Sequence, residues 1–122
     1  MSRYSLLLIG VVVVCSPAAA AQDALSALDD YNVQASIIFQ CHPSQSAADR
    51  AFLSKSDALR RAALTQLQSQ LDRADPAHRA DNAKKAAATL EERRAARDFD
   101  ISEQARNYGC DWLDGRLNVL PR

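Results

Sequence analysis

The chain contains very little glycine, cysteine or aromatic side chain. Its 122 residues include 3 glycines and 3 cysteines, and only 6% are aromatic. Two of the glycines, Gly109 and Gly115, lie close to the C-terminus, so the glycine-rich loops that bind phosphates or dinucleotides are missing. No GxSxG motif and no alternating apolar and polar strand pattern occurs either. The sequence therefore offers no motif for nucleotide chemistry or serine hydrolysis, and no evidence of a β-sheet.

A surplus of charge is also missing. Lys and Arg number 15, Asp and Glu number 15, and the formal net charge is +0 at pH 7. Nucleic acids and anionic membrane surfaces attract proteins that carry an excess of positive charge. We therefore expect neither nucleic acid nor a membrane surface as the partner.

The N-terminus has the layout of a secretory signal peptide. Arg3 precedes an unbroken apolar run from Leu6 to Val14, and small residues follow in "SPAAAAQ". The apolar run is well short of the ~20 residues that cross a bilayer. We expect cleavage after Ala21, which leaves residues 22–122 as a single helical domain, periplasmic or secreted, without stable membrane insertion. Lipidation at Cys15 is the disfavoured alternative, because Val14 is larger than the residue that normally precedes a lipidated cysteine.

Cleavage would leave two cysteines, Cys41 and Cys110. An even pair in an exported protein usually forms a disulfide. This bond would close a loop of about 70 residues and contribute ~4 kcal/mol to stability. A Cys41–Cys110 disulfide is therefore predicted.

Abundant alanine and few β-branched residues predict an all-α fold, a small bundle of about four helices. The expected helices span residues 23–41, 47–72, 76–97 and 100–114. Their start signals are Asp23, a capping box at Ser46 and Asp49, Asp75 before Pro76, and Asp100 with Glu103. Ser56 offers a second cap inside the second helix, so a kink near Ser54–Ser56 is an open alternative.

Apolar spacing suggests which faces are buried. The first helix has Leu28, Ala35 and Ile38 on one face, whereas the third has only a weak stripe formed by Ala80, Ala83, Ala87 and Leu90. One conflict remains open. An up-down-up-down bundle places the C-terminal ends of the first and fourth helices at opposite ends, which does not suit a disulfide between them.

The stretch "QCHPS" places His42 directly after Cys41. Neighbouring helical residues point about 100° apart, so His42 is badly placed to activate the Cys41 thiol. No CxxC or HExxH spacing is present, and we expect no metal and no cofactor. The alternative is a metal-binding protein or hydrolase that uses His42, Asp111 and neighbouring acids.

Two surfaces are candidates for partner binding. One is the basic group Arg93, Arg94 and Arg97, for which a solvated helix face is the favoured interpretation. The other is the pair Tyr108 and Trp112, but a lone Trp that shares a helix face with Ile101 is more often part of the core, and the core is the favoured interpretation. The sequence is most consistent with a non-enzymatic protein that binds another envelope or extracellular protein, in the manner of inhibitors, immunity proteins or stress-protective proteins.

Overall fold

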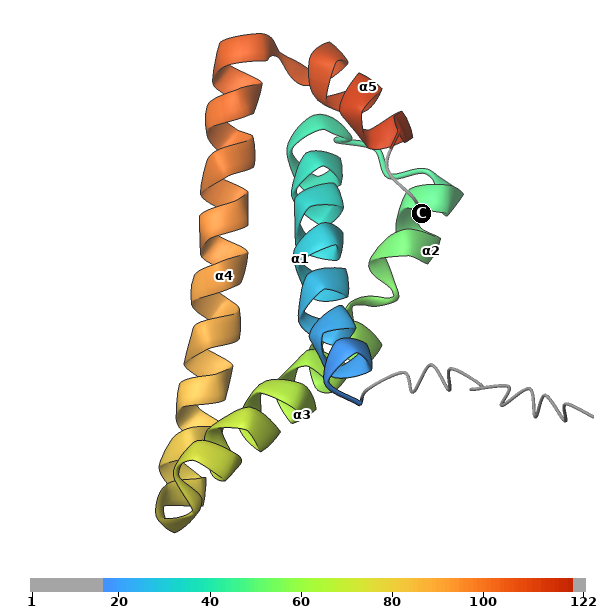
Figure 1. Cartoon of the computed structure of the whole chain (residues 1–122). Coiled ribbons are helices and arrows are strands. Elements are labelled where there is room, and N and C mark those ends of the chain that lie inside the picture. Colours follow the sequence, from blue (N-terminus) through green and yellow to red (C-terminus); the bar gives the residue numbers. More distant parts are fainter. Residues whose placement is uncertain (1–16, 120–122) are drawn as a thin grey trace, which may run out of the picture.

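The structure, a computed structural model, describes the backbone of residues 17–119, and within that range the side chains of residues 24–118. The described residues are almost entirely helical and contain no strand, which confirms the predicted all-α fold. The helices are α1 (Pro17–Cys41), α2 (Ala47–Leu53), α3 (Ser56–Ala74), the 3₁₀ turn η1 (Pro76–His78), α4 (Arg79–Tyr108) and α5 (Cys110–Val119) (Figure 1).

Three long helices, α1, α3 and α4, pack against one another. Figure 1 shows that α1 and α4 run in the same direction. Helix α3, which lies between them in the sequence, returns the chain to the other end of the bundle. The short helix α5 folds over the end where α1 and α4 finish, and α2 is an arm that joins α1 to α3. The molecule is thus a three-helix bundle closed at one end by α5.

Helix α1 contributes more residues to the core than any other helix. Ile37 and Ile38 are fully buried, and Leu28, Tyr31 and Ala35 lie at one face of the same helix. Their neighbours in the buried cluster come from every other α-helix: Phe52, Ala63, Leu90, Ile101, Leu113 and Leu117. Burial of a Leu, Ile or Phe side chain contributes about 1.5–3 kcal/mol, so this cluster holds the five helices together.

The predicted second helix is two helices with a break at Ser54 and Lys55. The Ser46–Asp49 capping box is present at the start of α2, as predicted. The Ser54 hydroxyl donates to the carbonyl of Ala51, a local bond that competes with helix continuation. The kink near Ser54–Ser56 is therefore confirmed as a full break, and it lets α2 and α3 point in different directions.

The predicted third helix and the predicted fourth helix up to Tyr108 form one helix, α4, and the rest of the predicted fourth helix belongs to α5. The expected cap at Asp100 is wrong: Asp100 lies inside α4 and pairs with Arg97 across one turn, at 3.7 Å. No glycine or proline occurs between Arg79 and Tyr108, so nothing in the sequence forces the helix to stop. The stop comes at Gly109, whose φ of 83° is readily adopted only by glycine.

Two other predicted starts need correction. Helix α1 begins at Pro17 rather than at Asp23. Asp75 does not cap with its side chain; its carboxylate instead bonds the His78 ring at 2.9 Å, and the chain passes through η1 before α4 begins. The predicted signal peptide lies largely outside the described residues, as does the alternative lipid site at Cys15.

The buried stripe of α4 is also shifted from the predicted one. Asn82, Ala86 and Leu90 are buried, whereas Ala80 and Ala87 are exposed. The Asn82 side chain donates to a carboxylate oxygen of Asp72 and to the carbonyl of Asp75, at 3.1 and 2.9 Å. These bonds tie the start of α4 to the end of α3 and set the rotation of α4 about its axis. Alanine on all sides of the helix could not indicate that rotation.

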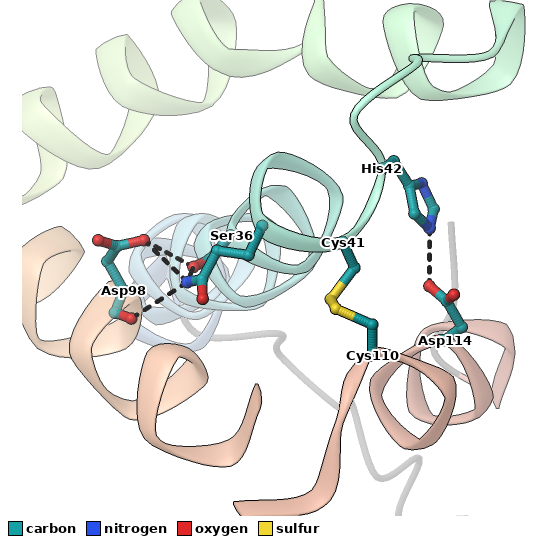
Figure 2. Close-up of a disulfide and its surroundings, with 7 residues drawn as sticks. Ser36, Cys41, His42, Asp98, Cys110 and Asp114 are labelled. Atoms are coloured by element: carbon teal, nitrogen blue, oxygen red, sulfur yellow. Dashed lines mark hydrogen bonds and ion pairs between the residues drawn. A yellow bond between two sulfur atoms is a disulfide. The ribbon is translucent and has the colours of Figure 1, made fainter. Parts of the chain in front are cut away.

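The length of α4 resolves the conflict over the disulfide. Because α4 continues past Asp100, it ends at the same end of the bundle as α1, and the turn at Gly109 directs α5 back over that end. Cys41, the last residue of α1, and Cys110, the first of α5, then meet with their Cα atoms 5.4 Å apart and form the predicted disulfide (Figure 2).

Candidate functional site

The disulfide end of the bundle gathers the most unusual polar contacts. His42 follows Cys41 and projects between α2 and α5. Its Nδ1 lies 3.0 Å from Oδ2 of Asp49, and its Nε2 lies 2.7 Å from Oδ1 of Asp114. Figure 2 shows the His42–Asp114 bond beside the Cys41–Cys110 bond. We call His42, Asp49 and Asp114 the His42 clamp.

The clamp favours the charged form of His42. Both partners are carboxylates, which accept but do not donate when ionised, so both contacts are hydrogen bonds when both ring nitrogens carry a proton. The hydrogen bond that His42 donates to Asp114 is the main cause that raises the pKa of His42, and the contact with Asp49 adds to it while partial burial opposes it. The backbone N–H of Ser46, together with His42, lowers the pKa of Asp49. The clamp is thus an imidazolium between two carboxylates.

The clamp engages both ring nitrogens of the histidine on which the enzymatic or metal-binding alternative relies. A general base needs a free ring nitrogen, and both nitrogens of His42 are taken by carboxylates. Cys41 is in a disulfide and has no thiolate to act as a nucleophile. Among the described residues, no group of three or more His, Cys, Asp or Glu side chains is placed to hold a metal ion. The geometry therefore supports a structural role for His42.

The sequence-based alternative grouped His42 with Asp111 and neighbouring acids, whereas the acids that contact His42 are Asp49 and Asp114. Asp111 is exposed, whereas Asp114 reaches the ring. Asp114 lies four residues after Cys110, which is one helical turn, so it shares a face with the cysteine. Once Cys110 is paired with Cys41, the same face of α5 must lie against the residue after Cys41. That spacing is the signal that could have predicted the contact.

The three arginines named from the sequence lie on α4, and each faces a carboxylate. Arg93 bonds both oxygens of Asp29 on α1, at 3.2 and 2.6 Å. Arg94 bonds Glu91, and Arg97 is close to Asp100. The Arg93–Asp29 pair joins two helices, and the other two pairs lie along α4 itself. The basic group is therefore largely balanced within the protein.

Tyr108 and Trp112 form a surface pair, which we call the aromatic corner. Their exposed fractions are 62% and 46%, and their ring centroids lie 4.7 Å apart. The favoured prediction that these two residues belong to the core is thus wrong, although Ile101 is buried as expected. Gly109 separates the two rings into different helices, and α5 turns Leu113 and Leu117 toward the core instead.

The backbone that carries the aromatic corner is fixed by contacts with the rest of the protein. Cys110, between Tyr108 and Trp112, is bonded to α1, and Leu113 is fully buried one residue after Trp112. Arg116 on α5 also donates to the side-chain carbonyl of Gln104 on α4. The corner therefore presents two aromatic rings on a covalently anchored turn.

The fold and these contacts define the protein as a small all-α protein with one disulfide joining the ends of two helices. Comparisons with protein-family models, curated proteins and solved structures find no match for this chain. Across residues 17–119, no helix combines the length and the apolar character needed to span a membrane.

Proposed function

We propose that this protein is exported and acts by binding another envelope or extracellular protein through the aromatic corner. The single observation that carries the proposal is the exposure of Tyr108 and Trp112 as a contacting pair. Trp and Tyr supply much of the binding energy at protein interfaces, and a fixed pair loses little entropy on binding. Inhibition, immunity and stress protection are the modes of action that fit such a binding protein.

The aromatic corner is preferred over the basic group as the contact surface. Arg93, Arg94 and Arg97 already face carboxylates of the same chain, so a partner would have to compete with these contacts. Tyr108 and Trp112 contact only each other among the aromatic side chains that the structure describes.

Export is supported by the contact at the start of the mature chain. The backbone N–H of Leu25 donates to the side-chain oxygen of Gln66 on α3, at 3.2 Å. In a helix that begins at Gln22, the four leading N–H groups have no acceptor within the helix. Leu25 is the last of these, because its usual acceptor is Ala21, the residue removed with the signal peptide. Gln66 therefore provides the acceptor that cleavage after Ala21 would take away.

The intact mass of the protein recovered from its own envelope tests export. We expect the mass of residues 22–122, lowered by one hydrogen molecule for the disulfide. Reduction and alkylation should then modify two thiols, Cys41 and Cys110, and only after reductant is added. A recovered mass that includes residues 1–21, or alkylation without reductant, would contradict the prediction.

Substitution of the aromatic corner tests the binding role. The oxidised protein is used to capture partners from its own envelope, and the enriched protein is then purified and titrated against each variant. We expect Trp112→Ala and Tyr108→Ala to weaken binding at least 10-fold, because interface aromatic residues commonly contribute about 2 kcal/mol or more.

Two controls use residues elsewhere on α4. Phe99→Ala removes an aromatic ring that is 65% exposed but lies outside the aromatic corner. The double variant Arg94→Ala, Arg97→Ala removes the exposed part of the basic group. We expect both controls to bind as the wild type does. If the arginine variant loses the partner and Trp112→Ala retains it, the contact surface is the basic group and the proposed one is wrong.

A further inference from the structure

A hollow of about 260 Å³ lies where α1, α4 and the start of α3 come together. We call it the Arg60 hollow. Tyr31, Ala35 and Leu53 form its apolar wall, Phe39 extends the wall toward solvent, and Ser56 and Arg60 stand on the α3 side. Helices α3 and α4 leave the same turn and diverge along their length, as Figure 1 shows, which explains why space opens at this level.

The charges around the hollow are mostly satisfied by other groups. The Asp98 carboxylate accepts the Ser36 hydroxyl at 2.7 Å and the Gln40 side-chain amide at 3.4 Å (Figure 2). Arg94 is bound to Glu91 on its own helix. The hollow therefore contains one carboxylate and one guanidinium that already have partners.

Arg60 differs from these groups. The described residues offer Arg60 no hydrogen bond and no ion pair. Its charge helps to lower the pKa of Glu91, but the hydrogen bond from Arg94 is the main cause of that shift. Its guanidinium also borders a second hollow of about 290 Å³, whose apolar side is Leu64, Ala87 and Leu90. A guanidinium has five N–H donors arranged to bind a carboxylate through two parallel hydrogen bonds. Arg60 is thus a solvent-exposed cation, without a hydrogen bond or ion pair among the described residues, beside an apolar wall.

We propose that the Arg60 hollow binds a small amphipathic carboxylate, with its carboxylate on the Arg60 guanidinium and its apolar chain against the apolar wall. The apolar wall requires an apolar group, and the free guanidinium requires an anion. The volume is just below the ~300–1,000 Å³ of common small-molecule sites, so the ligand is small, such as a medium-chain fatty acid, rather than a folded partner.

This site is separate from the aromatic corner. Neither Tyr108 nor Trp112 lines the hollow, so ligand binding here and partner binding there can fail independently. The proposal therefore does not rest on the proposed function.

Calorimetric titration of the full mature, oxidised protein with octanoate, below its micelle concentration, tests the proposal. We expect saturable binding to the wild type and at least 10-fold weaker binding to Arg60→Gln, which removes the charge but keeps the side-chain length. Loss of one charge-assisted contact of this kind is enough for such a change. Arg73→Gln, at the exposed far end of the same helix, is the matched control and should bind octanoate as the wild type does.

Two further ligands separate the contributions of charge and apolar surface. Octanamide, which is neutral, should bind the wild type at least 10-fold more weakly than octanoate, a comparison that needs no variant to fold. Acetate should not bind measurably. Backbone NMR shifts on addition of octanoate should centre on Ala35, Leu53 and Ser56.

Several results would overturn the proposal. They are the absence of octanoate binding, equal binding by the wild type and Arg60→Gln, equal binding of octanoate and octanamide, and shifts confined to the aromatic corner. Binding of an acidic helical peptide at this surface without any binding of octanoate would also overturn it, and would indicate a macromolecular partner instead.

Discussion

Replacement of both Cys41 and Cys110 by serine is expected to lower the free energy of unfolding by ~4 kcal/mol. The disulfide closes a loop of 69 residues. In the chain-entropy model this cross-link lowers the conformational entropy of the unfolded state and thereby raises its free energy relative to the folded state. Small domains have a total stability of about 5–15 kcal/mol, so the double variant should retain a small margin. Urea unfolding followed by circular dichroism measures the difference.

The control for this prediction is the wild type with and without reductant. Reduction of the wild type should give the same loss as the double serine variant, because both lack the same covalent bond. The free energy of unfolding of the double serine variant should be the same with and without reductant. A loss below about 1 kcal/mol in both experiments would show that packing of α5, through Leu113 and Leu117, is sufficient without the disulfide.

Replacement of His42 by glutamine is expected to remove most of the pH dependence of stability between mildly acidic and mildly alkaline pH. The pKa of His42 is raised in the folded protein, chiefly by its hydrogen bond to Asp114. A raised pKa means that the folded state holds the proton more tightly than the unfolded state does. The stabilisation is therefore complete below the unfolded histidine value of about 6.5, and it is lost as the pH rises through the folded value.

At acidic pH the stabilisation by the clamp is limited by Asp49, whose pKa is lowered by the Ser46 backbone N–H and by His42. A lowered carboxylate pKa contributes stability that is present above the unfolded value of about 3.9 and is lost as the pH falls through the folded value. The clamp should therefore stabilise the protein most between about pH 4 and pH 6.5. Below that range Asp49 gains a proton, and above it His42 loses one.

Denaturant unfolding at about pH 5.5 and about pH 8.5, on either side of the histidine range, provides the measurement. The wild type should be more stable at the lower pH, and His42→Gln should show a clearly smaller difference and, at the lower pH, a loss of about 2 kcal/mol relative to the wild type. His78→Gln is the matched control, because His78 is exposed and bonds only the nearby Asp75. A pH dependence that His78→Gln removes and His42→Gln leaves unchanged would refute the assignment to the clamp.

Local signals in the sequence predicted local features well. The capping box at Ser46 and Asp49 starts α2, as predicted, and Gly109 ends α4. The spacing of apolar residues identified the buried face of α1 because large side chains alternate there with polar ones. The same spacing did not identify the buried face of α4, because alanine occurs on all sides of that helix. The contacts of Asn82, not hydrophobic spacing, determine the rotation of α4.

The error at Asp100 had the largest consequence. A cap residue is a permissive signal: Asp at a helix start satisfies free N–H groups, but an aspartate inside a helix is equally tolerated when it pairs with Arg one turn away. A glycine at positive φ is a stronger signal, because other residues rarely adopt that backbone conformation. Gly109 therefore decided where α4 ends, and Asp100 did not.

The sequence by itself determined the helical class, which follows from composition, and the pairing of Cys41 with Cys110, which follows from the even number of cysteines left after export. It also indicated, through local hydrogen bonding, a break at Ser54–Ser56 as an open alternative. Only the tertiary structure decided that α1 and α4 end together, that His42 lies between Asp49 and Asp114, and that Arg60 borders an apolar hollow without a partner. The physical reason is that each of these arrangements brings together residues from different helices, and their meeting depends on helix lengths and rotations that local preferences do not encode.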